Sequence, residues 1–177
     1  MTTNLPFGLN PQAGATALHW AEGALTNGDL GSVWEFMHHD FQLTLAQLWI
    51  LSGLESDALD ALDRDEAARQ LVHREHQLAG RMIHDSMRQL RHANQPIRGE
   101  TLLLGTAARP ISPDIEAVAL FLESEVPDGV FPSGEHRTVL AIPVHVATER
   151  PLVLGAGWIA QPGWPPKMLP IDGSPTG

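Results

Sequence analysis

Residues 63–93 read DRDEAARQLVHREHQLAGRMIHDSMRQLRHA and carry the strongest helical pattern in the 177-residue chain. Asp63 and Glu66 form a D-x-x-E pair of the capping-box type, so we expect a long helix to begin there. The apolar residues that would form its buried side are Leu71, Val72, Leu78, Met82, Ile83 and Leu90. Pro96 ends the pattern. At ~1.5 Å per residue, a helix over residues 64–93 would span about 45 Å, a length that needs a sheet to lie across.

The residues that follow this helix carry strand patterns. Four segments rich in large apolar and β-branched residues alternate with turn-forming residues. These segments cover residues 100–106, 115–123, 137–147 and 152–161. Pro143, inside the third segment, indicates an edge strand or a bulge. Because consecutive strands joined by short loops pair antiparallel, helices followed by strands predict an α+β fold.

The segments before the long helix and after the last strand are less regular. Residues 1–14 contain two prolines and two glycines, so we expect an irregular arm, and residues 163–177 are expected to form an irregular tail. Residues 15–26 carry an amphipathic helix pattern, and Asp29 is a candidate N-cap for a short second helix. Residues 41–51 fit both a strand and a helical turn, and we favour a short strand that runs into a helical turn.

The composition argues against several classes of protein. A net charge of -10 repels phosphate backbones, which argues against nucleic-acid binding. The chain has no cysteine, so disulfides, thiolate metal sites and cysteine nucleophiles are excluded. It shows no signal-peptide pattern and no apolar run long enough to cross a membrane. We therefore expect one cytoplasmic domain over residues 15–162, without a membrane partner.

One segment carries a resemblance to a known superfamily. Residues 28–43 read GDLGSVWEFMHHDFQL, which resembles the G-D-[LV]-x-x-[LVW]…[LM]-x-x-D-[FV] stretch that links the first two helices to the first strand in NTF2-like (cystatin-like) proteins of the SnoaL-like type. The resemblance implies an NTF2-like cone, in which N-terminal helices including one long helix pack on a bent antiparallel sheet of about four strands. It also implies an apolar cavity, and a homodimer through the outer face of the sheet.

Three residues are candidates for acid–base catalysis. Asp40 follows the predicted second helix in the run His38-His39-Asp40, His76 borders the apolar side of the predicted long helix, and His145 lies in the third predicted strand. Any of the three would be able to move a proton if it faced an apolar cavity. Solvent-exposed or structural side chains explain the same residues, and we favour that interpretation.

Three further residues are candidates for ligand binding. Trp49 and Trp158 are large flat apolar groups that suit an apolar cavity or a dimer interface, and equally the core. Glu116, in the second predicted strand, would add a polar group to such a cavity. No metal site is predicted, because His73 and His84 on the predicted long helix would lie ~16 Å apart. No motif for a cofactor is present either.

Two classes of function fit these observations. The first is a non-catalytic NTF2-like module that binds a small apolar ligand or assembles as a homodimer. The second is a SnoaL-like isomerase, cyclase or hydrolase that uses one acid–base residue on a hydrophobic substrate. We favour the first, because the steroid-isomerase type of site in this superfamily requires a tyrosine and the chain contains none.

Overall fold

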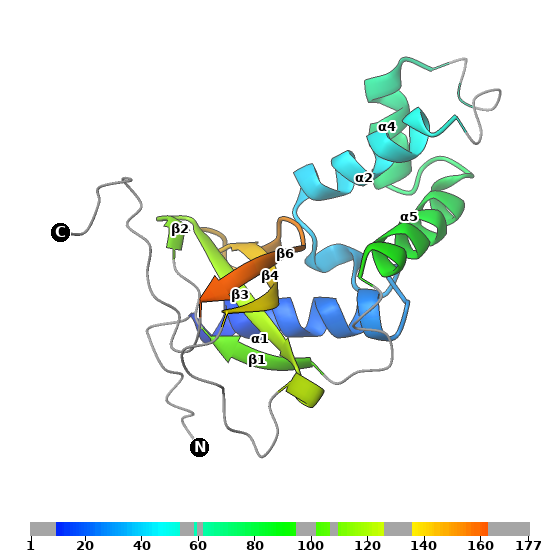
Figure 1. Ribbon diagram of the computed structural model, residues 1–177. Coiled ribbons are helices and arrows are strands. Elements are labelled where there is room, and N and C mark those ends of the chain that lie inside the picture. Colours follow the sequence, from blue (N-terminus) through cyan, green and yellow to red (C-terminus); the bar gives the residue numbers. More distant parts are fainter. Residues whose placement is uncertain are drawn as a thin grey trace. The chain divides into compact units, whose positions relative to one another are not determined.

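The computed structural model describes residues 10–53, 59, 62–94, 102–106, 110–125 and 136–162 (Figure 1). The fold is α+β, as predicted: helices come first in the chain and antiparallel strands follow. The contacts divide the chain into two compact units. The sheet unit comprises residues 1–18 and 100–177, and the helical unit comprises residues 19–99. The single domain expected over residues 15–162 stays a prediction.

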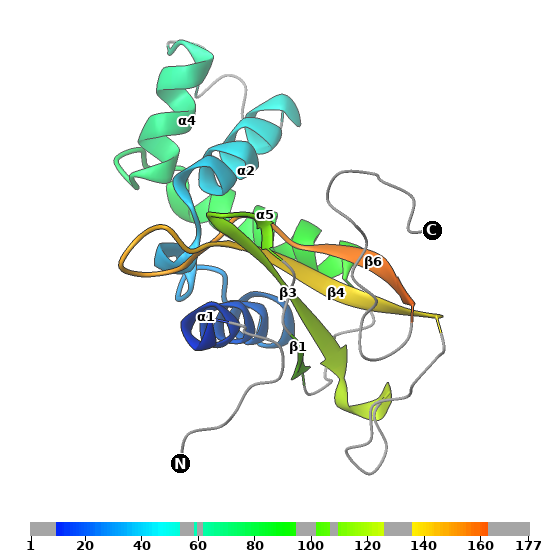
Figure 2. The same ribbon diagram turned by 90° about the vertical axis from the view of Figure 1, so that its left-hand side faces the viewer.

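The sheet unit contains one antiparallel sheet of six strands. The strands are β1 (Leu102–Thr106), β2 (Pro110–Ser112), β3 (Ile115–Leu122), β4 (His136–His145), β5 (Leu152–Val153) and β6 (Gly157–Pro162), with a short 3-10 helix, η4 (Glu123–Glu125), after β3. The expected number of four strands is wrong. The edge of β3 that pairs with β1 also pairs with β2, and the predicted fourth segment is split into β5 and β6, which both pair with β4. Figure 2 shows β3, β4 and β6 side by side.

The register between β3 and β4 assigns side chains to the two faces of the sheet. Val118 pairs with Ile142 and Leu120 pairs with Leu140, and all four side chains are buried. Directly opposed residues of an antiparallel pair lie on the same face, so these pairs form the apolar core of the sheet unit. Residues on either side of them in the sequence, such as Ala119, lie on the other face.

Pro143 lies inside the central strand β4, so the expected edge position is wrong. Its carbonyl accepts a hydrogen bond of 2.8 Å from the backbone N–H of Leu154, on the side where β5 and β6 pair. The ring nitrogen points to that same side, because the two polar groups of one strand residue share a direction. The pairing with β4 changes there from β6, which ends opposite Ala141, to β5, which begins opposite Val144. The missing donor of proline is therefore tolerated.

Helix α1 (Pro11–Ala21) begins earlier than the sequence pattern predicts. The Oδ1 atom of Asn10 accepts a hydrogen bond of 3.0 Å from the backbone N–H of Gln12, so Asn10 caps the helix. Proline suits the first helical position, because its missing N–H needs no partner there. The expected irregular arm is thus wrong for residues 11–14. Residues 1–9 of the arm and residues 163–177 lie outside the described residues.

Helix α1 continues into a π-helical turn, η1 (Glu22–Thr26), in the helical unit. The predicted short second helix is a turn followed by a 3-10 helix, η2 (Trp34–Phe36). The carboxylate of Asp29 accepts the backbone N–H of Ser32 at 3.1 Å. Asp29 therefore caps a turn and not an α-helix.

Residues 41–51 belong to one helix, α2 (His39–Leu51), so the expected strand is wrong. Leu45, Ala46 and Trp49 are buried, a spacing that follows the helical period. Leu48 and Leu51 are exposed to 53% and 61%. Phe41, Leu43 and Leu45, which alternate like a strand in the sequence, are half-buried or buried on this helix.

The predicted long helix is broken into α4 (Arg64–Val72) and α5 (Ala79–Ala93). Its predicted start is confirmed, with Asp63 as the N-cap residue of α4. The break is a turn in which Arg74 adopts a positive φ of 59°. The guanidinium of Arg74 donates to the carbonyl of Gly31 at 3.1 Å. This long-range bond, which the sequence pattern does not contain, helps to hold the turn.

Large apolar side chains from several segments form the core of the helical unit. The largest fully buried ones are Trp20, Leu25, Leu30, Val33, Leu71 and Met82. The indole N–H of Trp34 also donates to the carbonyl of Val72 at 3.4 Å, which ties η2 to the end of α4. Across the part of the chain that the structure describes, no helix is long and apolar enough to cross a membrane.

Candidate functional site

The titratable candidate site residues are distributed over both units of the chain. Asp40 and His76 belong to the helical unit, whereas Glu116 and His145 belong to the sheet unit. Among the described residues, no three histidine or acidic side chains gather in a group that could hold a metal ion.

Asp40 lies in the first turn of α2, and not after a helix as the sequence pattern predicts. Its backbone N–H donates to Nδ1 of His38 at 3.3 Å, and its carboxylate lies 3.6 Å from the same nitrogen. The Asp40 side chain is 79% exposed. A carboxylate at a helix N-terminus stabilises the helix through its dipole. The surroundings of Asp40 thus explain it as part of a helix start.

His76 lies in the turn between α4 and α5, so its expected position on a continuous helix is wrong. Its Nδ1 atom accepts the backbone N–H of Leu78 at 3.2 Å. Leu78 is the N-cap residue of α5, and no side-chain cap bond forms at Leu78 itself. The first backbone N–H groups of a helix have no carbonyl partner within the helix. The imidazole of His76 supplies an acceptor for one of them at the start of α5.

Glu116 and His145 lie on opposite faces of the sheet. Glu116 pairs with Val144 and Ile115 pairs with His145, and neighbouring residues of one strand point to opposite sides. Glu116 shares the face that carries the buried core. Its Oε2 atom accepts the backbone N–H of Asn10 at 3.2 Å, at the start of α1. The two residues therefore cannot act together on one substrate.

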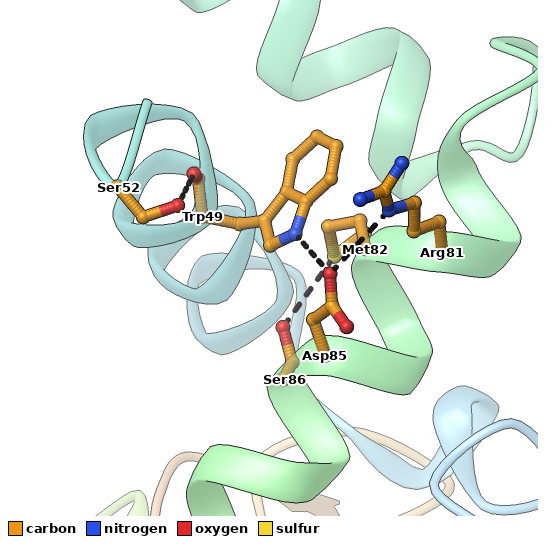
Figure 3. A network of polar contacts seen from close by, with 6 residues as sticks. All are labelled: Trp49, Ser52, Arg81, Met82, Asp85 and Ser86. Atoms are coloured by element: carbon orange, nitrogen blue, oxygen red, sulfur yellow. Dashed lines mark hydrogen bonds and ion pairs between the residues drawn. The ribbon is translucent and has the colours of Figure 1, made fainter. Parts of the chain in front are cut away.

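Trp49 is buried to 2% exposure in the helical unit. Its indole N–H donates to the carboxylate of Asp85 at 3.0 Å, and the Nε atom of Arg81 lies 3.9 Å from the same oxygen. Figure 3 shows the indole and the guanidinium converging on this carboxylate. Trp49 is thus a core residue with a satisfied polar group. Trp158 lies in β6 opposite Leu140, and its side chain lies outside the described part.

Sequence reasoning missed Asp85, whose carboxylate lies between the indole of Trp49 and the guanidinium of Arg81. The signal available was local: Arg81 and Asp85 are spaced four residues apart on α5, which is typical of an ion pair along a helix. The contact with Trp49 joins residues 36 positions apart, and no sequence period connects them. The polar network also includes Ser86, whose hydroxyl lies 3.7 Å from the sulfur of Met82.

The outer face of β3 and β4 is the second feature that sequence reasoning left unassigned. We define it by the residues opposite the core at one end of this strand pair: Ile115, Ala117, Ala119, Ala141, Pro143 and His145. All six are half-buried. None carries an acidic, lysine or arginine side chain, although one face of an antiparallel sheet is often solvated and polar. The side chains of this face are apolar except for the imidazole of His145, and Phe121 and Val139 further along the same face are buried.

Comparison with protein-family models, with curated proteins and with solved structures finds no match to this chain.

Proposed function

We propose that this chain is a non-catalytic NTF2-like module that binds a small apolar ligand or assembles as a homodimer. Of these two activities, the described residues favour assembly. The observation that carries this choice is the outer face of β3 and β4, which carries five apolar side chains and one imidazole, and no acidic, lysine or arginine side chain. Removing water from such a surface costs little free energy, because apolar side chains are weakly hydrated. Covering it with a second copy of the chain is therefore favourable.

The hydrogen bonds of His76 and Glu116 support the non-catalytic part of this proposal. The Nδ1 atom of His76 and the carboxylate of Glu116 each accept a backbone N–H at the start of a helix. Both bonds give these side chains a structural role at the start of a helix.

The alternative, a SnoaL-like isomerase, cyclase or hydrolase, needs one acid–base residue that faces an apolar cavity. Glu116 comes nearest to this description, because it lies on the core face beside Val118 and Val144. Its hydrogen bond with Asn10 gives it a structural role instead. No described contact pairs Glu116 with a second polar side chain of a catalytic kind, and we therefore do not favour the enzyme.

Matched arginine substitutions test the proposed assembly. Ala117→Arg puts a long charged side chain on the outer face, whereas Ala147→Arg makes the same change at an exposed residue after β4. We expect Ala117→Arg to convert the protein from dimer to monomer in size-exclusion chromatography with light scattering. Ala147→Arg should elute like the wild type. Equal behaviour of the two variants would argue against this interface.

A further inference from the structure

Two histidines outside the sites described above face each other on the helical unit. His39 is the first residue of α2, and His73 directly follows α4. Their ring centroids lie 5.6 Å apart, with the ring planes inclined by 30°. Both residues are exposed. Within the described part of the chain, neither imidazole makes a hydrogen bond, so their nitrogens are available to a ligand.

Two hydrogen bonds near the histidines hold the backbone at the start of α2 and at the end of α4. The side-chain amide of Gln42, one turn along α2 from His39, donates to the carbonyl of Trp34 at 2.8 Å. The indole N–H of Trp34 in turn donates to the carbonyl of Val72, the neighbour of His73. The same residue, Trp34, thus holds the start of α2 and the end of α4. These two bonds hold together the backbone segments that carry His39 and His73.

We propose that His39 and His73 form a surface site for a divalent transition-metal cation, with water molecules completing the coordination. Two imidazoles that bind one tetrahedral zinc ion through bonds of ~2.0–2.1 Å have ring centres roughly 5 Å apart. The observed separation of 5.6 Å is close to this value. Both side chains are exposed, so their rings can rotate to direct one nitrogen each at a shared ion.

The surroundings define the class of cation that the site takes. Imidazole nitrogens suit copper, nickel and zinc, whereas magnesium and calcium require oxygen ligands. The C-terminal end of α4 favours positive charge at His73, and the exposed carboxylate of Asp40 offsets the positive end of the α2 dipole at His39. No group of three ligating side chains is present among the described residues. The site is therefore a weak one, and Cu²⁺ should bind most tightly.

Thermal unfolding of the untagged full chain tests the site. We expect Cu²⁺, and less strongly Ni²⁺ and Zn²⁺, to raise the Tm by about 5 °C at a concentration roughly ten times the dissociation constant. Mg²⁺ should leave the Tm unchanged. His39→Gln and His73→Gln should each abolish the shift, and the double variant should lose nothing more. His84→Gln, which removes another exposed histidine of the same unit, should keep the full shift.

Three results would overturn this site. The first is a wild-type chain whose Tm does not respond to any of the three transition metals. The second is a shift that survives in His73→Gln, since the ion would then be held by the neighbours His38 and His39 alone. The third is an equal loss in His84→Gln. The test is independent of the proposed function, because the site lies on the helical unit and its readout is the Tm.

Discussion

The indole N–H of Trp49 donates a hydrogen bond of 3.0 Å to the carboxylate of Asp85, and this bond joins α2 to α5. The indole is buried, whereas the Asp85 side chain is 21% exposed and lies within 3.9 Å of Arg81. A buried polar group that loses its partner costs free energy, so the two residues depend on each other. Trp49 thus stabilises the helical unit through its polar nitrogen as well as its apolar ring.

Trp49→Phe should lower the free energy of unfolding by about 1–2 kcal/mol, because it removes the donor to a part-buried carboxylate and leaves space beside it. Asp85→Asn should cost less, since the amide oxygen still accepts the indole N–H. Arg81→Gln should cost under about 1 kcal/mol, because the guanidinium is 54% exposed and distant. Urea unfolding checks all three values. A wild-type stability for Trp49→Phe would mean that the bond contributes nothing.

His76→Ala should destabilise the chain by roughly 1 kcal/mol, because Nδ1 of the imidazole accepts the N–H of Leu78 at the start of α5. His76→Asn should restore part of the loss, since its side-chain oxygen can replace the acceptor. The comparison uses chemical denaturation followed by circular dichroism. Identical stabilities of the two variants would show that the hydrogen bond is not the reason for the effect.

Gly28 and Gly80 should respond to alanine with opposite signs. Gly28 has a φ of +71°, and an added Cβ would lie 2.5 Å from Nη1 of Arg91, so Gly28→Ala should cost about 1–2 kcal/mol. Gly80 lies inside α5 with nothing within 4 Å of an added Cβ, so Gly80→Ala should stabilise by up to about 1 kcal/mol. The melting temperatures of the two variants, each compared with that of the wild type, test this prediction. Changes of the same sign would contradict the backbone geometry at Gly28.

The parts of the fold that follow a local period could be predicted from the sequence. The strand patterns predicted β3 and β4 correctly, and Asp63 with Glu66 predicted the start of α4. The break between α4 and α5 could not be predicted, because residues 73–78 contain neither glycine nor proline and a bond from Arg74 to Gly31 helps to hold the turn.

Candidate site residues were harder to predict, since their roles depend on contacts between distant segments. The size of Trp49 left a cavity, an interface and the core equally open, and only its burial and its bond to the distant Asp85 assign it to the core. His76 was expected on a helix face, and the turn that changes its role is the one the pattern missed. The NTF2-like resemblance and the cone shape stay predictions.

The mass of the wild-type protein in solution tests the proposed homodimer most directly. The chain has a mass of 19.2 kDa, and light scattering or sedimentation equilibrium over a range of micromolar concentrations separates one copy from two. We expect twice the mass of the chain, falling to that of a single chain on dilution and in Ala117→Arg. A mass of one chain at every concentration would contradict assembly through the outer face of β3 and β4.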